Sequence, residues 1–591
     1  MSPEPALGIS ASITGRRWLW RQADARTGLM LAQRLGLPEL VGRLLAARGI
    51  GAEAAADFLS PRLRASLPDP SSLIDMDRAA ERLAQAVRRG EKVAVFADYD
   101  VDGACAGALL VEGLGRLGAR VFHYVPDRLA EGYGPNAAAI TRLCDAGAEL
   151  IVCVDCGIAA HQALAAAKGR ADVVVLDHHK ADGPPPPVLA AVNPNRLDCP
   201  SGQRMLCAAG VVFLALVALQ RTLRRQGFFA AGREEPDLLQ ELDLVALATV
   251  CDVMPLRDVN RALVAQGLRV LARRARPGLA ALLEVAGTRG EVTAHTLGFV
   301  LGPRINAGGR IAEPDLGLRL LLARDPIEAR AMAERLDAVN RRRQEVEAEV
   351  LAQAIAQAEA QLAAGRGVLV AAGRGWHPGV VGIVASRLKE RFNRPACVAG
   401  VDGGLAKGSG RSVPGLDLGA AVLWAKSAGL LAAGGGHPMA AGFALPEERL
   451  PAFQDLLEER LPEAAALPAA SDLLLDGSLP VRAAGVEMAE AVQRLAPFGP
   501  ANEEPIFVLP GVRVVKADRV GAEGSVIRAF LEGPDGGRLR AVCFRAKEGP
   551  LAELLLSSQG APLHLAGHLR AERWNDQTTA TLHVLDGGVA G

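Results

Sequence analysis

The hydrophobic pattern between Lys92 and Asp182 predicts a parallel β-sheet. Four short apolar runs, each as long as a strand, alternate with segments of helical length. Strands that alternate with helices form βαβ units, and such units build a sheet whose strands run in one direction. Four consecutive prolines at 184–187 end the pattern and predict a loop. The predicted strands are Val93–Ala97, Val121–Tyr124, Leu150–Val154 and Val173–Leu176.

A long helix is predicted further along the chain. Its pattern begins at Asp325-Pro326, an N-cap followed by proline at the first helical position, and contains neither Gly nor Pro until Gly365. At 1.5 Å per residue such a helix would be roughly 55 Å long. A helix of this length typically connects domains.

The rest of the chain predicts three further parts. Residues before about 75 are mixed, with helical periodicity around Met30–Arg48. A second α/β block runs from Val368 to about Leu445, and the short β-like runs and Gly-rich turns after about residue 470 suit a small barrel such as an OB fold. We therefore predict an α/β protein with five segments: an N-terminal extension (1–75), a parallel-sheet domain (76–323), a connector helix (324–365), a smaller α/β domain (366–465) and a β-rich, OB-fold-like domain (466–591).

Length and composition limit the possible functions. A chain of 591 residues is too long for one hydrophobic core. Sixty-six basic residues are balanced by sixty-six acidic ones, so the net charge does not attract polyanions from a distance. Aromatic residues, at 4%, are too few for extensive base-stacking surfaces. Any contact with nucleic acid must therefore come from a local basic track.

The cysteines and apolar runs predict a cytoplasmic protein. Nine cysteines are scattered along the chain without two CxxC motifs that could form a pair, and the first residues show no signal-peptide pattern, so reduced thiols are expected. The apolar run Leu206–Leu219 is too short for a membrane span of about 20 residues. We expect a monomer that does not contact a membrane.

Acidic residues follow three of the predicted strands. The first strand ends in Asp98-Tyr-Asp-Val-Asp-Gly, the third in Asp155-Cys-Gly and the fourth in Asp177-His-His. Ligands of an open parallel sheet bind outside the carboxyl ends of its strands, so these segments predict one shared site. A further carboxylate, Asp252, follows the apolar run Leu244–Val250.

A group of carboxylates predicts bound cations. Close carboxylates repel one another and raise each other's pKa unless a cation neutralises them. Carboxylate-rich ligation with one or two imidazoles suits Mn²⁺ or Mg²⁺ better than a structural zinc ion. The number of candidate ligands predicts two ions, about 3.5–4 Å apart.

Two other interpretations fit less well. Asp98-x-Asp-x-Asp-Gly resembles the opening of a calcium-binding EF-hand loop, but Leu109 stands at position twelve, where a Glu is required, and a strand precedes the loop instead of a helix. Cys153-x-x-Cys156 has the spacing of a redox pair, but Cys153 lies in a predicted strand, and core thiols are favoured.

The four acidic motifs resemble those of the DHH phosphoesterase superfamily. They are Asp98-Tyr-Asp-Val-Asp-Gly, Val-Asp155-Cys-Gly-Ile, Asp177-His-His and Val-Cys-Asp252-Val-Met-Pro. Four downstream segments are similar to those of the RecJ-like exonucleases and their DHHA1 domain: Leu301-Gly-Pro-Arg-Ile-Asn-Ala-Gly-Gly-Arg310, Gly375-Trp-His-Pro-Gly-Val-Val-Gly382, Lys407-Gly-Ser-Gly-Arg-Ser412 and Gly434-Gly-Gly-His-Pro-Met-Ala-Ala-Gly442. The likeness covers roughly residues 30 to 590.

The resemblance implies a role for each motif. One ion would be held by Asp100 and Asp155 with Asp98 close by, and a second by Asp102, Asp155, His178 and Asp252. The implied catalytic residues are Asp155, His178 and His179, with His179 facing the phosphate. The implied substrate-binding residues are Arg304, Asn306, Arg310, His377, Lys407, Ser409, Arg411, Ser412 and His437.

Several of these substrate residues lie in Gly-rich segments. A planar guanidinium suits the non-bridging phosphate oxygens, so Arg304 and Arg310 are interpreted as a clamp in a Gly-rich turn. Cations, hydroxyls and glycines alternate in residues 407–412, as close approach to a phosphate chain requires, although an exposed turn is an alternative. His377 and His437 are expected in loops, where each either binds substrate or orders a turn.

The activity that the resemblance implies is 5′→3′ exonucleolytic hydrolysis of single-stranded DNA to 5′-mononucleotides, by two-metal catalysis, in recombination and repair. A helicase and a single-strand-binding protein are the expected partners. If the second α/β block folds across from the first, a narrow cleft would admit one strand and exclude a duplex. The basic residues at 513, 516, 519, 528, 538, 540 and 545 are interpreted as a strand-binding track, with solvated edge charges as the alternative.

Two alternative functions remain. One is a DHH-type phosphodiesterase that acts on short oligonucleotides, cyclic dinucleotides or pyrophosphate; the long connector and the C-terminal segment favour a polymer instead. The other is a non-catalytic single-strand-binding protein with a DHH fold. Because every expected ligand position is filled, an enzyme is favoured.

Overall fold

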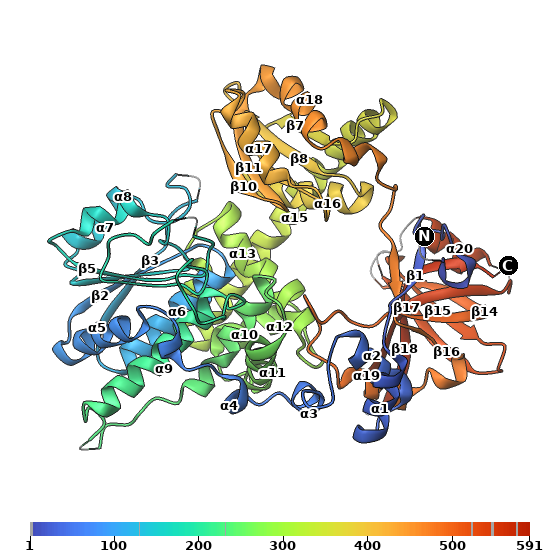
Figure 1. Cartoon of the computed structure of the whole chain (residues 1–591), viewed down its shortest axis with the longest axis horizontal. Helices are drawn as coiled ribbons and strands as arrows, with labels where there is room; N and C mark the ends of the chain where they lie inside the picture. Colours follow the sequence, from blue (N-terminus) through green and yellow to red (C-terminus); the bar gives the residue numbers. More distant parts are fainter. Residues whose placement is uncertain are drawn as a thin grey trace. The chain divides into compact units, whose positions relative to one another are not determined.

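The computed structural model describes residues 4–128, 130–181, 183–230, 232–521, 524–544, 549–558, 560–574 and 577–590. The chain divides into two compact units, each assembled from segments that are distant in sequence (Figure 1). One unit consists of residues 56–341 and 495–504, and the other of residues 1–55, 342–494 and 505–591. No helix in the described part of the chain is long and apolar enough to cross a membrane.

The first unit contains a five-stranded parallel sheet with the order β3-β2-β4-β5-β6. The four strands predicted from apolar runs are confirmed. The fifth strand was not predicted, because three residues after a run of prolines are too few to show a period. The strands are β2 (Lys92–Ala97), β3 (Arg120–Tyr124), β4 (Leu150–Val154), β5 (Asp172–Leu176) and β6 (Ala190–Val192).

Helices cover both faces of this sheet. Val95 and Ala97 belong to one core and Ala94 and Phe96 to another, since successive side chains of a strand point to opposite faces. Burial on both faces explains why the strands are continuous apolar runs. On one side pack α5 (Met76–Arg89), α6 (Val101–Arg116) and α9 (Ala208–Arg225), and on the other α7 (Ala137–Asp145) and α8 (His161–Leu164) (Figure 1).

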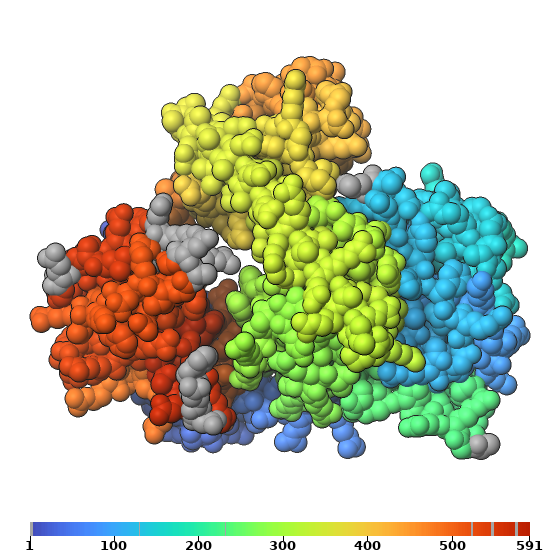
Figure 2. Space-filling view, turned by 180° about the vertical axis from the view of Figure 1, so that it is seen from behind, coloured from blue at the N-terminus to red at the C-terminus, as the bar shows by residue number. Residues whose placement is uncertain are grey.

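The predicted connector is confirmed as the 38-residue helix α15 (Pro326–Ala363). Its first half buries Ala333 and Leu336 in a core of the first unit, and its second half buries Val350 and Ala354 in a core of the second. Its exposed flank is visible in yellow-green in Figure 2. The other helices of the first unit are α3 (Ala55–Leu59), α4 (Leu63–Ser66), α10 (Leu242–Cys251), α11 (Asp258–Ala272), α12 (Pro277–Val285), α13 (Gly302–Ile311) and α14 (Leu316–Leu322).

The second unit contains the predicted smaller α/β block, a mixed sheet with the order β10-β11-β9-β8-β7. The second half of α15 and α16 pack in one core of this sheet, and α17 and α18 in the other. The elements are β7 (Leu369–Arg374), α16 (Pro378–Phe392), β8 (Ala396–Asp402), β9 (Leu405–Arg411), α17 (Leu418–Ser427), β10 (Ala433–His437), β11 (Ala440–Pro446) and α18 (Leu450–Arg460).

The C-terminal residues form a β-barrel, as predicted. Its strands follow the order β14-β15-β16-β18-β17, and the pairing of β14 with β17 closes it, so that these strands leave no open edge. Its elements are β13 (Gly477–Ser478), α19 (Val486–Gln493), β14 (Phe507–Val520), β15 (Val526–Glu532), β16 (Arg538–Phe544), α20 (Pro550–Ser557), β17 (Leu563–Trp574) and β18 (Gln577–Val589).

The N-terminal segment packs with the barrel. β1 (Trp18–Trp20) pairs in parallel with β12 (Leu473–Leu475), and the buried Trp18 donates its Nε1 hydrogen to Asp586 Oδ2 at 2.9 Å. The helices α1 (Ala25–Leu35) and α2 (Glu39–Ala47) follow. The five segment boundaries proposed from the sequence stay a prediction.

Candidate metal centre

Three acidic motifs meet at the carboxyl edge of the parallel sheet. The last residues of β2, β4 and β5 are register partners, so Asp98, Asp155 and Asp177 emerge side by side. All three side chains are buried. The structure thus brings together the strand ends in the way that the sequence predicts.

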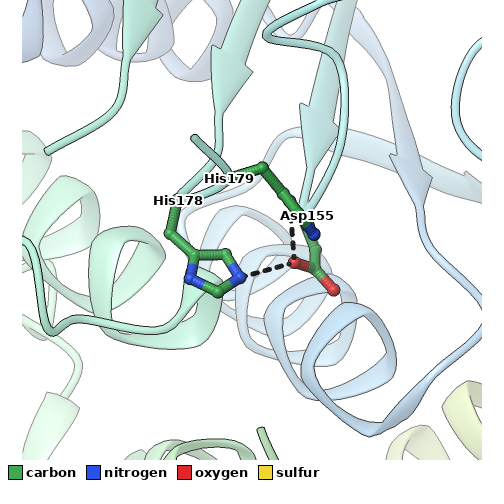
Figure 3. A group of neighbouring side chains, drawn as sticks. All are labelled: Asp155, His178 and His179. Carbon is green, nitrogen blue, oxygen red and sulfur yellow. Dashed lines mark ion pairs between the residues drawn. The ribbon is translucent and has the colours of Figure 1, made fainter. Parts of the chain in front are cut away.

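His178 lies at the middle of a carboxylate cluster. Its Nε2 is 3.3 Å from Asp155 Oδ1, 3.5 Å from Asp252 Oδ2 and 3.6 Å from Asp102 Oδ2. Nδ1 of His179 is 3.8 Å from the same Asp155 oxygen, which therefore faces both imidazoles (Figure 3).

The possible ligand atoms form three overlapping groups in which they lie within 4.8 Å of one another. Asp155 and His178 each belong to two groups, so the groups merge into one centre. The assignment of these residues to two ions stays a prediction. The groups are Asp98, Asp100 and Asp155; Asp102, His178 and Asp252; and Asp155, His178 and His179.

Burial is the main cause that raises the pKa of four of these carboxyl groups. The pKa is raised well above its usual value at Asp98 and Asp155, raised at Asp102, and raised to about 8 at Asp252. The neighbouring charge of Asp100 adds to the rise at each of the four. Without a cation the cluster would therefore retain protons near neutral pH.

The donor set fits divalent cations. In the part of the chain that the structure describes, Oδ1 of Asp98, Oδ1 of Asp155 and Oδ2 of Asp252 are buried and have no hydrogen-bond partner. A buried carboxylate oxygen without a partner is costly, and a cation would satisfy it. Carboxylate oxygens with imidazole nitrogen suit Mn²⁺ or Mg²⁺.

The sequence analysis missed the role of Asp177, which orients the histidines. Its Oδ1 accepts hydrogen bonds from the backbone N–H groups of His178 (2.7 Å) and His179 (3.1 Å) and from His179 Nδ1 (2.8 Å). Its Oδ2 accepts from Ile158 N at 3.0 Å. Asp at the strand end was the signal, but its hydrogen bonds depend on the turn that follows.

Charge is divided clearly between Asp177 and His179. Burial alone would raise the pKa of Asp177, but the hydrogen bonds and charge of His179 outweigh it, so this pKa is lowered. Burial likewise disfavours protonated His179, but Asp177 outweighs it and raises the pKa of His179 to about 9. Asp177 is therefore the anion and His179 the cation of this pair, and Nδ1 of His179 donates its hydrogen to Asp177.

Three other side chains that the sequence analysis did not single out contact the histidine segment. Asn193 donates to His179 O at 2.8 Å, and Asn195 donates to His178 O at 2.6 Å. Tyr133 Oη lies 3.1 Å from His179 Nδ1 and 3.2 Å from Asp155 O. The only local sequence feature that could have indicated the two Asn contacts is the pair of Asn residues around a proline after β6. The contact of Tyr133 with His179 joins residues far apart in the sequence, so no local pattern could have indicated it.

Backbone donors position two further carboxylates. Asp100 is the N-cap of α6, and its Oδ1 accepts from Gly103 N at 2.9 Å. Both oxygens of Asp102 accept backbone N–H groups at the start of α9, from Ala208 at 2.6 Å and Ala209 at 2.8 Å. Helix N-termini favour negative charge, so these contacts offset part of the effect of burial, which still leaves the pKa of Asp102 raised.

The segment of Arg304 and Arg310 is a helix, so the predicted Gly-rich turn is wrong. A Cβ atom at Gly309 would lie 2.6 Å from Tyr99 O, so glycine allows α13 to approach the loop after β2. Asn306 Oδ1 accepts from Val101 N at 3.2 Å and supports the same loop. Tertiary packing therefore overrides the low helix propensity of glycine.

The two arginines of α13 differ. Arg304 donates from Nε to Asp337 Oδ1 at 2.9 Å and from Nη1 to Val300 O at 2.7 Å, which joins α13 to α15. Arg310, in the last turn of α13, is near enough for its charge to act on the phenol of Tyr99. Phosphate contact by either arginine stays a prediction.

His377 and His437 both lie in the second unit. His377 is the N-cap of α16, and its Nδ1 accepts from Gly379 N at 3.0 Å, so it orders this turn. His437 is exposed and is the last residue of β10, so its prediction as a loop residue is wrong. Pairing with Ala440 in β11 extends the strand through it.

Residues 407–411 lie in strand β9, so the alternative of an exposed turn is wrong. Lys407, Ser409 and Arg411 point to the face covered by α16, because side chains alternate along a strand. Glycine between them serves packing on the other face: a Cβ atom at Gly408 would lie 2.3 Å from Phe443 Cζ. The strand thus presents two cations and a hydroxyl on one face.

Ser412 differs from the other predicted substrate-binding residues of this segment. It is fully buried, and its Oγ donates to Leu416 O at 2.8 Å. A hydroxyl with this environment supports the turn after β9, and its contact with substrate stays a prediction.

The barrel has a mixed basic and aromatic face. Lys516, Phe530 and Arg540 are register partners on β14, β15 and β16. Phe530 is 42% exposed and Phe544 is 54% exposed, so the low aromatic content of the chain does not exclude stacking at this place. Arg545, which was predicted for the basic track, lies outside the described residues.

Three family models match the chain in the order of the structural parts. The DHH family N-terminal domain matches residues 92–249, the DHHA1 domain residues 365–463, and the RecJ OB domain residues 475–586.

Curated relatives match over most of the chain. The single-stranded-DNA-specific exonuclease RecJ of Bacillus subtilis is 35% identical over 583 residues, which are 97% of this chain and 71% of that protein. The protein of the same name from Escherichia coli is 38% identical over 486 residues, 80% of this chain and 83% of the relative.

A solved structure agrees with these matches. The crystal structure of RecJ in complex with Mn²⁺ from Thermus thermophilus has a TM-score of 0.78 and 32% identity, and the similarity covers 96% of this chain and 79% of that chain. The corresponding complex with Mg²⁺ has a TM-score of 0.72 and 30% identity, over 96% of this chain and 78% of that chain.

Proposed function

The chain belongs to the RecJ family of exonucleases, and from this premise we propose that it degrades single-stranded DNA in the 5′→3′ direction to 5′-mononucleotides. It is a metal-dependent exonuclease whose metal is Mn²⁺ or Mg²⁺. The direction, the use of two ions and a role in recombination and repair are parts of the proposal. So are a monomeric state, a cytoplasmic location and the partners expected from the sequence.

One observation supports the proposal most directly: buried carboxylates from distant segments converge on His178, and three of their oxygens lack partners among the described residues. We assign one ion to Asp100 and Asp155 with Asp98 close by. We assign the second to Asp102, Asp155, His178 and Asp252.

Two divalent cations at such a cluster supply an acidified water and stabilise charge on phosphoryl oxygens. The protein's own groups do the rest. Asp155 would contribute a ligand to both ions, and Asp102 is fixed by backbone N–H groups at the start of α9. His179, held through Nδ1 by Asp177, would donate a hydrogen bond to the phosphate.

Substrate contacts extend beyond the metal centre in this proposal. Lys407, Ser409, Arg411 and His437 would bind the phosphate backbone, since two of them are cations on one face of β9. Lys516, Phe530 and Arg540 would bind a strand further along, with bases stacked on the aromatic ring. Arg304, Asn306, Arg310 and His377 are the other substrate-binding residues of the proposal, although Asn306 and His377 also order the segments in which they lie.

The test uses single strands labelled at either the 5′ or the 3′ end, with Mn²⁺, Mg²⁺ or chelator. A single labelled nucleotide as the first product from only the 5′ label, and no product in chelator, is the expected result. A first mononucleotide from the 3′ label would contradict the direction. Blunt duplex cleaved as fast as a single strand would contradict the predicted selectivity for one strand.

The same assay separates the alternatives. A phosphodiesterase of short oligonucleotides or cyclic dinucleotides would leave long strands intact and cut those small substrates. A non-catalytic binding protein would retain single strands without any product. Either outcome would overturn the proposal.

A further inference from the structure

Residues 495–504, which we name the inserted loop, connect α19 to β14 in the sequence but pack with the unit that holds the metal centre. No motif of the sequence analysis lies in this loop. Asn502, which is 1% exposed, donates from Nδ2 to Leu495 O at 2.9 Å and to Pro497 O at 2.8 Å. Because Asn502 donates both amide hydrogens to carbonyl groups of the loop itself, the backbone of the inserted loop has a defined shape.

Arg261 of α11 holds the inserted loop against the rest of this unit. Its guanidinium, in a residue only 2% exposed, donates from Nη2 to Leu495 O at 3.0 Å and to Ala496 O at 2.8 Å. Its Nε donates to Phe58 O at 2.8 Å. A buried guanidinium that is satisfied by carbonyl groups fixes the backbone that supplies them.

The loop also contacts the segment that follows Asp252. Leu256 donates its backbone N–H to Pro500 O at 2.8 Å, and its side chain is fully buried. Gly499 lies so close that a Cβ atom there would be 2.7 Å from Leu256 Cδ1. The residue held in this way is only four positions from a proposed metal ligand.

The backbone between Asp252 and Leu256 needs support from outside. Val253 has a left-handed conformation with φ +59°, which is unfavourable for a β-branched residue, and its side chain is 67% exposed, so its own packing does not explain it. Met254 N donates to Thr249 O at 3.1 Å and ties the turn to α10. A strained conformation persists only where both sides are held.

On the far side of the turn two contacts supply this support. Asn260 Nδ2 donates to Pro255 O at 3.1 Å, and Leu256 is held by the inserted loop. We propose that the inserted loop is a positioning element for Asp252: it sets the backbone after α10 so that the carboxylate points at His178. The inference rests on the proposed assignment of Asp252 as a metal ligand. It makes metal affinity depend on residues from the C-terminal third of the chain.

The test measures Mn²⁺ binding to the full-length, metal-free protein by electron paramagnetic resonance, from the loss of the free-ion signal. Gly499→Ala adds one methyl group against Leu256 and removes no hydrogen bond. Asn502→Ala releases the loop carbonyls. Both variants are expected to weaken Mn²⁺ binding roughly tenfold, the range for partners that only orient a ligand. Asp252→Asn should weaken it at least as much.

Two controls separate positioning from general destabilisation. Gly485→Ala adds a methyl group where nothing lies within 4 Å. Arg82→Met removes a buried ion pair with Glu91 at the amino edge of the parallel sheet, opposite the metal centre. Both should retain wild-type Mn²⁺ affinity, even though Arg82→Met lowers the melting temperature.

The outcomes are distinct. Wild-type affinity in folded Gly499→Ala, with weakened binding in Asp252→Asn, would overturn the inference and leave the proposed function standing. Wild-type affinity in Asp252→Asn would overturn the ligand assignment, and the inference with it. If Asn502→Ala does not fold, Gly499→Ala decides the test alone.

Discussion

The parallel sheet of the metal centre and the mixed sheet of residues 369–446 present polar side chains in different ways. The parallel sheet uses the ends of its strands, where Asp98, Asp155 and Asp177 emerge together and are buried. The mixed sheet uses one face of β9, where Lys407 is exposed and Arg411 is half-buried. Strand ends converge on a point, whereas a strand face extends along a line.

The two arrangements suit different ligands. Convergent carboxylates suit a small cation, and their mutual repulsion makes the site unfavourable without it. Cations spaced along a strand suit a polyanion, which is bound by many weak contacts. The difference implies that changes at the metal centre affect turnover and stability in opposite directions, whereas changes on β9 affect binding of the strand.

The largest expected effect is at Asp155. Asp155→Asn should lower the exonuclease rate by more than about 100-fold, because residues that merely orient a ligand are already worth 10- to 100-fold. The same change should raise the melting temperature of the metal-free protein, since a buried Asn needs neither a bound proton nor a cation, whereas a buried Asp155 needs one of them. The exonuclease rate and the metal-free melting temperature are measured on the same preparation of the variant.

Asp172→Asn is the matched control, at the other end of the neighbouring strand and half-exposed. It should retain the wild-type rate. An Asp155→Asn variant that keeps turnover would remove the distinction between the two sheets.

The next effect is the pH dependence of stability. The pKa values of Asp98, Asp155 and Asp252 are raised in the folded protein, that of Asp252 to about 8, so between about pH 4 and this value the folded state binds more protons than the unfolded state. The free energy of unfolding of the metal-free protein therefore falls as the pH rises through this range. The raised pKa of His179 acts in the same direction.

Thermal melts in chelator should give a higher melting temperature at pH 5 than at pH 8, and Mn²⁺ should restore stability at pH 8. Asp252→Asn should reduce the slope. A metal-free melting temperature that is higher at pH 8 would show that the carboxylates are not the dominant titrating groups.

A smaller effect is expected on the face of β9. Lys407→Ala should raise KM for single-stranded DNA several-fold and reduce the slope of log affinity against log salt by about one, as for one lost phosphate contact. Mn²⁺ affinity should not change. Lys426→Ala, an exposed lysine of α17 on the opposite side of the sheet, is the control and should leave KM unaltered.

The smallest effect separates two neighbouring serines. Ser412→Ala removes the buried hydrogen bond to Leu416 O and should cost about 1 kcal/mol of stability without changing KM. Ser409→Ala should raise KM modestly without changing the melting temperature. Equal effects on KM would support a substrate contact of Ser412 as well.

Some features of this protein follow from short stretches of sequence. The parallel strands and α15 were predicted because burial on both faces and unbroken helical periodicity leave strong local patterns. The convergence of Asp98, Asp155 and Asp177 followed from strand direction alone. Resemblance supplied the remaining proposed ligands, such as Asp252, which lies after a helix and not after a strand.

Other features were decided by tertiary structure. The segment around Gly309 became a helix because it packs on Tyr99, and glycine in β9 serves close packing against Phe443. The burial of Ser412, the hydrogen bond of Ile158 to Asp177 and the contact of the inserted loop with Leu256 depend on the packing of segments that no local pattern relates.

The sequence by itself therefore determined which chemistry the chain offers and at which edge of a sheet it gathers, since strand period and direction are local properties. Only the tertiary structure decided which polar groups can bind a metal ion or substrate and which are already hydrogen-bonded within the protein. The reason is that many of these hydrogen-bond partners come from distant parts of the chain.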